Sequence, residues 1–141
     1  MAYLWLVIAA GLGVAASRWD TSGGIWGASR HALTVGFISV MILSVGQRIL
    51  PALAGMRALW SPRLMFLALV LLTLGCALRV SSEVLAYQDY ANWAWRVLPP
   101  SALLELAALT LFAVNMLGTF VLQPGHAIKE PMVARIAEST H

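Results

Sequence analysis

Four long runs of apolar residues, separated by short polar or aromatic segments, make up most of the chain. The runs cover about residues 2–17, 30–54, 63–82 and 101–122. Roughly 20 mostly apolar residues are needed for a helix to cross the hydrocarbon core of a bilayer. The pattern therefore predicts an all-α integral membrane protein with four transmembrane helices in an up-down bundle. This domain would span residues 1–122, and a polar tail would follow over 123–141.

The segments between the runs predict where the helices begin and end. Gly23, Gly24 and Gly27 disfavour regular helix, so we expect residues 18–29 to form a connector. Ser61 followed by Pro62 predicts the start of the third helix, because serine caps helices and proline fits their first position. The first run has the length of a signal peptide but lacks a basic segment before it. We expect it to be retained as a span, although cleavage stays open.

The segment 83–100 combines aromatic side chains with few charges. It contains Tyr87, Tyr90, Trp93 and Trp95. Tyrosine and tryptophan are enriched where a membrane meets water. The segment is therefore expected to lie in the membrane interface and not to form a free loop.

Composition narrows the protein to the membrane class. The chain is 60% hydrophobic and 11% charged, with a mean hydropathy of +0.81. Soluble domains carry about a quarter charged residues. The net charge of +3 comes from basic residues near the ends of the apolar runs, where they anchor and orient helices. The lipid bilayer is thus an expected partner and nucleic acid is not.

The distribution of basic residues predicts an orientation. Four spans place both termini on one side of the membrane. That side would hold Arg48, Arg57, Arg63, Lys129 and Arg135, and the other Arg18, Arg30, Arg79 and Arg96. Because the cytoplasmic side carries the excess of basic residues, we expect a multi-pass protein of the bacterial inner membrane with cytoplasmic termini.

His31 is the strongest candidate for cofactor chemistry, as the one histidine in or beside an apolar run. A neutral imidazole is a good ligand for haem iron, but a structural hydrogen bond is the competing role. His126 lies beyond the fourth run, about 30 Å away across the membrane, so it cannot complete the same site. A haem b at His31 would need a ligand from another chain, an open position or a dimer. His31 alone is too little for a copper site.

Charged residues near the outer interface have two candidate roles. Arg30, Arg79 and Arg96 could pair with haem propionates, or they could be interfacial anchors whose charged ends reach water. Glu105 lies about one turn into the fourth run, at a depth similar to that of Arg79 in an antiparallel pair of helices. The sequence thus predicts a structural Arg79–Glu105 ion pair, which would lower the cost of both charges in the membrane.

One stretch resembles a known family. Arg30-His31-Ala32-Leu33-Thr34-Val35-Gly36, followed by Met41-Ile42 and Arg48, is similar to a stretch near the C-terminus of the NnrS family, and Ala77-Leu78-Arg79-Val80 continues the resemblance. The similarity covers about residues 30–122. NnrS proteins are multi-span membrane proteins that bind haem and copper, and are linked to nitric oxide and nitrosative stress. The family has about twelve spans and several histidines, so the resemblance implies His31 alone as a candidate ligand here.

These observations support a small accessory subunit of a larger membrane complex, not catalytic by itself. It would pack through its helices and the aromatic 83–100 segment against other membrane-protein subunits or a second copy. The alternative is an NnrS-like haem-binding protein with His31 as axial ligand, linked to electron transfer or nitrogen-oxide chemistry. A small transporter is disfavoured because the apolar runs lack a polar pathway.

Overall fold

The computed structural model describes residues 2–53 and 59–122. The tail over 123–141, with Lys129 and Arg135, and also Arg57 lie outside the described residues. The elements in chain order are α1 (Ala2–Trp19), α2 (Gly24–His31), the π-helix η1 (Ala32–Ser39), α3 (Val40–Leu53), α4 (Pro62–Tyr87), the 3-10 helix η2 (Asn92–Arg96) and α5 (Leu98–Leu122). The all-helical prediction is confirmed for the part of the chain that is described.

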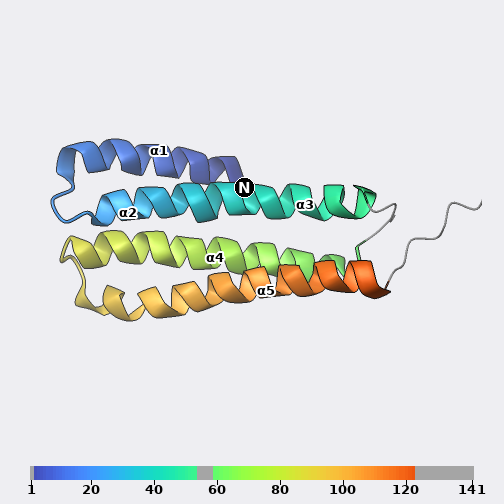
Figure 1. Ribbon diagram of the computed structural model, residues 1–141. Helices are drawn as coiled ribbons and strands as arrows, with labels where there is room; N and C mark the ends of the chain where they lie inside the picture. Colours follow the sequence, from blue (N-terminus) through green and yellow to red (C-terminus); the bar gives the residue numbers. More distant parts are fainter. Residues whose placement is uncertain (1, 54–58, 123–141) are drawn as a thin grey trace, which may run out of the picture.

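The helices form rods that lie side by side with roughly parallel axes (Figure 1). α2, η1 and α3 join into one rod, α1 packs beside its first half, and α4 packs along α5. Four segments are long and apolar enough to cross a membrane: Ala2–Trp19, Gly24–Leu53, Pro62–Tyr87 and Asn92–Leu122. We call the end with residues 20–23 and 88–97 the aromatic end, and the end with residues 59–61 the Trp60 end.

The prediction of a connector over residues 18–29 is wrong for most of its length. Only residues 20–23 form the turn, and α2 begins at Gly24. A Cβ atom on Gly27 would lie 3.6 Å from the Glu83 carboxylate, and one on Gly24 would lie 3.1 Å from the Glu83 carbonyl oxygen. These glycines therefore let α2 approach α4 closely, a use that their helix-breaking tendency does not reveal.

The turn residues Ser61 and Pro62 act as predicted. Ser61 is the N-cap of α4, its hydroxyl accepts a hydrogen bond from the Leu64 N–H at 3.4 Å, and Pro62 follows at the first position. This segment is also fixed to α5: the Thr119 hydroxyl accepts from the Trp60 N–H at 3.0 Å, and the side-chain Oδ1 of Asn115 accepts from the Ser61 N–H at 3.0 Å. Buried side chains of α5 thus satisfy backbone donors that precede α4.

Asp20 fixes the turn at the aromatic end. Its carboxylate accepts hydrogen bonds from the backbone N–H of Gly23 at 2.8 Å and of Trp26 at 2.7 Å. The first N–H groups of a helix lack partners within the helix, and Gly23, in the left-handed region with φ of 83°, has no side chain to cap them. Asp20 therefore caps α2 from outside it, and Gln88 ties the same carboxylate to the end of α4 at 3.3 Å.

The cap makes stability depend on pH. Desolvation raises the pKa of Asp20, but backbone N–H donors, led by that of Trp26, outweigh it and hold the pKa below its usual 3.8. Such a carboxyl stabilises the fold fully above its unfolded-state pKa, and this contribution is lost as the pH falls through the lower folded-state pKa. We expect Asp20→Asn to lower the thermal unfolding midpoint at about pH 6 and to match the wild type well below about pH 3. Circular dichroism in detergent measures both.

Asp89→Asn is the matched control, because it removes a carboxylate at the same end and asparagine tolerates the positive φ of 56° at this position. If this variant and Asp20→Asn lowered the midpoint equally at about pH 6, the capping role of Asp20 would be wrong.

Candidate functional site

His31 and Glu105 form the central polar contact of the bundle. The imidazole Nε2 lies 2.8 Å from the Glu105 Oε1 atom, which joins the last residue of α2 to α5 across 74 positions in sequence. The side chains are 23% and 14% exposed. Between them they can hold one shared proton, as an imidazolium–carboxylate pair or as a neutral pair. Either form satisfies both groups at a partly buried position, where an unpaired charge is costly.

The sequence of α4 makes room for this contact. Gly75 lies opposite Glu105, and a Cβ atom at Gly75 would come within 2.8 Å of Glu105 Cγ and 3.1 Å of the Ser101 carbonyl oxygen. The absence of a side chain therefore sets how closely α4 and α5 pack. Cys76, the next residue, is fully buried, and its Sγ lies 4.0 Å from the His31 carbonyl oxygen. The glycine and the cysteine thus form the α4 side of the site.

The predicted Arg79–Glu105 pair is replaced by two other pairs. Arg79 Nε donates to Glu83 Oε1 at 3.1 Å, one turn along the same helix, while Glu105 pairs with His31. Similar depth alone does not decide the partner, because a carboxylate four residues away on its own helix offers Arg79 a nearer one. Glu83 lies in α4, and its second oxygen, Oε2, faces Gly27 of α2. This oxygen is buried and has no hydrogen-bond partner among the described residues.

The other two arginines take separate positions at the aromatic end. The Arg30 guanidinium lies 5.3 Å from the centre of the Trp26 ring, in cation–π geometry. Arg96 is exposed at the end of η2. The three arginines predicted to bind propionates therefore have different surroundings: an indole ring for Arg30, a carboxylate for Arg79 and an exposed surface for Arg96. The first and last suit the role of interfacial anchors.

The site does not present the donor set of a metal centre. Over residues 2–53 and 59–122, no group of three or more histidine, cysteine, aspartate or glutamate side chains is placed to hold a metal ion. The Nε2 atom of His31, the usual haem ligand, is engaged with Glu105. The arrangement seen here therefore does not fit axial ligation through Nε2 unless Glu105 is displaced.

Sequence reasoning identified His31 and Glu105 separately but missed their contact. A signal was available, because each lies close to the start of its run, His31 at the start of the second and Glu105 about one turn into the fourth. The depth argument that chose Arg79 applies equally to His31. What decides between them is which faces of α2, α4 and α5 meet, and this comes from the packing at Gly75 and not from depth.

Aromatic side chains surround this end of the molecule. The exposed ones are Trp19, Trp26, Tyr87, Tyr90, Trp93 and Trp95. The rings of Tyr87 and Trp95 contact each other with centres 4.9 Å apart. The His31–Glu105 pair thus lies farther into the bundle than these side chains, which are of the kind enriched at membrane interfaces.

Comparison with known proteins places the chain in a family. No curated protein and no solved structure matches the chain. A family model does match, and it covers residues 1–121, which include all four apolar helices almost to the end of α5. The chain therefore belongs to the DUF8744 family, described as a domain of unknown function.

Proposed function

We propose that the protein is a small accessory subunit of a membrane complex, inserted as an up-down bundle of four spans. The observation that carries this proposal is the surface of the rods. Large apolar side chains are exposed on every one of them, including Val7 at 69%, Ile42 at 60%, Phe66 at 71% and Leu103 at 66%. Only lipid or another apolar protein surface covers so much exposed hydrocarbon favourably.

The polar side chains inside the bundle support a structural role. His31–Glu105 links α2 to α5, the Ser29 hydroxyl donates to the Ala9 carbonyl at 2.8 Å and links α2 to α1, and Asn115 binds the segment before α4. These groups bond to neighbouring segments and hold the helices in register. A transporter would instead need polar groups that face a continuous path.

In the proposed orientation the aromatic end faces the outside of the bacterial inner membrane and the Trp60 end faces the cytoplasm. The slight excess of basic residues in the sequence supports it. Arg48, Arg57, Arg63, Lys129 and Arg135 would lie on the cytoplasmic side, against Arg18, Arg30, Arg79 and Arg96 on the other. The exposed segment over η2, with Trp93 60% exposed, would provide a contact outside the hydrocarbon core.

Site-specific photocrosslinking tests the accessory role. A benzophenone amino acid is placed at Trp93, at Phe66 or at Leu103, all exposed, and cells are irradiated before membranes are isolated. We expect a discrete protein adduct from Trp93 and from at least one helix position. An adduct with the same chain would indicate a homo-oligomer, and one with another protein a hetero-complex. Lipid adducts alone at all three positions would contradict the proposal, and release of the chain by alkaline carbonate would contradict insertion.

Haem binding through His31 is the second candidate, favoured by an imidazole that is 23% exposed and oriented by a carboxylate. Metal-ligating histidines are commonly oriented in this way through their other ring nitrogen. In the described arrangement Glu105 is bonded to Nε2. A haem iron would therefore bind Nδ1, or it would bind Nε2 after Glu105 had been displaced. Reduced-minus-oxidised spectra of the chain purified with its partners test this. A haem band lost in His31→Ala supports it, and a band unchanged in that variant excludes His31 as the essential ligand.

A further inference from the structure

Two hollows lie next to each other on the surface of α3. The first, about 460 Å³, is lined by Ser44, Val45, Gln47, Arg48 and Ile49. The second, about 440 Å³, is lined by Met41, Ile42, Val45, Gly46, Ile49 and Leu50. Val45 and Ile49 line both, so the two hollows adjoin each other. One is polar and basic, and the other is lined by apolar residues alone.

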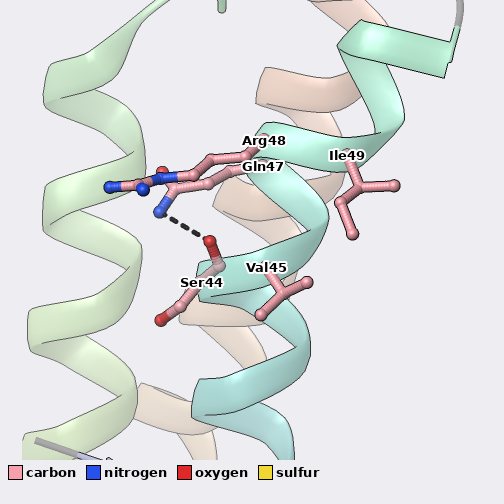
Figure 2. Close-up of a pocket in the computed structure, with 5 residues that line it drawn as sticks. All are labelled: Ser44, Val45, Gln47, Arg48 and Ile49. Atoms are coloured by element: carbon pink, nitrogen blue, oxygen red, sulfur yellow. Dashed lines mark hydrogen bonds between the residues drawn. The ribbon is translucent and has the colours of Figure 1, made fainter.

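The polar hollow suits an anion. Figure 2 shows the Gln47 and Arg48 side chains next to each other on one side of α3, while Val45 and Ile49 point to the other side. Gln47 is fixed by a hydrogen bond from its Nε2 to the Ser44 carbonyl oxygen at 3.1 Å. Arg48 is exposed and takes part in neither of the two ion pairs of the described residues. Its guanidinium can therefore donate two parallel hydrogen bonds to a phosphate.

The apolar hollow suits a hydrocarbon chain. It lies over Gly46, where a Cβ atom would be 3.7 Å from Phe112 of α5 and 3.7 Å from Leu50. Its outer side is formed by Ile42, 60% exposed, and Ile49, 49% exposed. A flexible apolar chain can lie along this surface in van der Waals contact with it, without burying any polar atom.

The depth of Arg48 matches that of a lipid headgroup. The uncharged stretch of the second span runs over residues 32–47 and is about 24 Å long at the rise of a helix. The hydrocarbon core is roughly 30 Å thick. With His31 near one boundary, Arg48 lies just inside the other, from where its long side chain reaches the phosphate level.

We propose that this surface of α3 binds one anionic phospholipid of the surrounding bilayer. The phosphodiester is held by Arg48 in the polar hollow, and the first part of an acyl chain lies over Gly46 in the apolar one. The proposal rests on the membrane insertion proposed above but not on the accessory role. A free phosphate ion would occupy only the first hollow. A partner helix that covered this surface would desolvate the Arg48 guanidinium.

Native mass spectrometry of the full chain, released from a mild detergent, tests the site with phosphatidylglycerol and with zwitterionic phosphatidylcholine of the same acyl chains. We expect one phosphatidylglycerol to be retained by the wild type. Arg48→Gln should weaken its binding roughly five- to tenfold, since one basic residue near a membrane contributes about that much to the binding of anionic lipid. Val45→Trp, at a position 43% exposed, should block the hollows and weaken binding at least as much.

Two control variants keep the test specific. Arg96→Gln removes the same charge at the aromatic end, and Val121→Trp adds the same bulk on α5 at a position 70% exposed. Both should bind phosphatidylglycerol like the wild type. Equal loss from Arg48→Gln and Arg96→Gln would overturn the site in favour of general charge attraction. Equal retention of the two lipids would also overturn it.

Two further outcomes identify other occupants and would overturn the proposal. Millimolar inorganic phosphate that displaces phosphatidylglycerol from the wild type and also binds Val45→Trp equally well would indicate an ion site. A benzophenone amino acid at Ile49 that gives a protein adduct in membranes, instead of a lipid adduct, would indicate a partner helix. Crosslinking at Trp93 reports the accessory role separately, so failure of one proposal is distinguishable from failure of the other.

Discussion

Replacing Glu105 with alanine is expected to lower the free energy of unfolding by roughly 1–3 kcal/mol, since it leaves the partly buried His31 without its partner. Both side chains are less than a quarter exposed, so water replaces the lost contact only in part. His31→Ala should cost a similar amount, because the Glu105 carboxylate then loses the only partner that it has among the described residues. Unfolding in mixed micelles with increasing dodecyl sulfate, followed by tryptophan fluorescence, measures these changes.

A double-mutant cycle separates the pair from the individual side chains. If His31 and Glu105 act together, the double alanine variant should lose much less than the sum of the two single losses. Glu105→Gln keeps a carbonyl oxygen that can accept a hydrogen bond from the imidazole and should retain part of the stability. Thr110→Ala is the control on α5, because its hydroxyl bonds only to Leu106 in its own helix and is exposed. Additive losses in the cycle would show that the contact does not couple α2 to α5.

The same variants inform the choice between the candidate functions. If the pair is purely structural, its variants affect stability and assembly. The amount of assembled complex should then return to the wild-type level when unfolding is suppressed at low temperature. A cofactor role predicts instead that Glu105→Gln changes a spectrum or a redox potential in a complex that is fully assembled. The distinction depends on measuring both quantities on the same preparation.

The helices could be predicted from the sequence because the apolar runs are long enough to cross a membrane. A run of apolar residues that is long enough to span the bilayer has few alternatives to a helix, since backbone groups in hydrocarbon must bond within the segment. The start of α4 followed from Ser61 and Pro62, whose capping chemistry is local. Local signals were sufficient wherever the partner of a group lay within a few residues.

Contacts between helices were not predictable in the same way. Gly24 and Gly27 looked like helix breakers, yet they lie within α2 because their missing side chains admit α4. The partner of Glu105 depended on which helix faces meet, because His31 and Arg79 were both available at a similar depth. A sequence gives depth through hydropathy, but the rotation of each helix about its axis depends on the fit of small and large residues across the interface.

Gly75 offers the clearest test of that fit. Gly75→Ala is expected to destabilise the bundle by roughly 1–3 kcal/mol, because the new methyl group meets backbone atoms that cannot rotate away. Its Cβ would lie 3.1 Å from the Ser101 carbonyl oxygen and 3.2 Å from the Glu105 N atom, so α4 and α5 must separate. Gly46→Ala is the matched control, since its Cβ would find its nearest neighbours at 3.7 Å, an ordinary contact distance. Dodecyl sulfate unfolding measures both variants.

The Gly75 substitution should also weaken the His31–Glu105 pair, because its Cβ would lie 2.8 Å from Glu105 Cγ and would displace that side chain. Introduced into Glu105→Ala, which lacks Cγ, Gly75→Ala should therefore cost less than in the wild type, while the backbone contacts keep the cost above zero. If Gly75→Ala cost no more than Gly46→Ala, close packing of α4 on α5 would not be what holds Glu105 against His31. An equal cost in both backgrounds would show that the glycine sets the helix spacing without positioning the carboxylate.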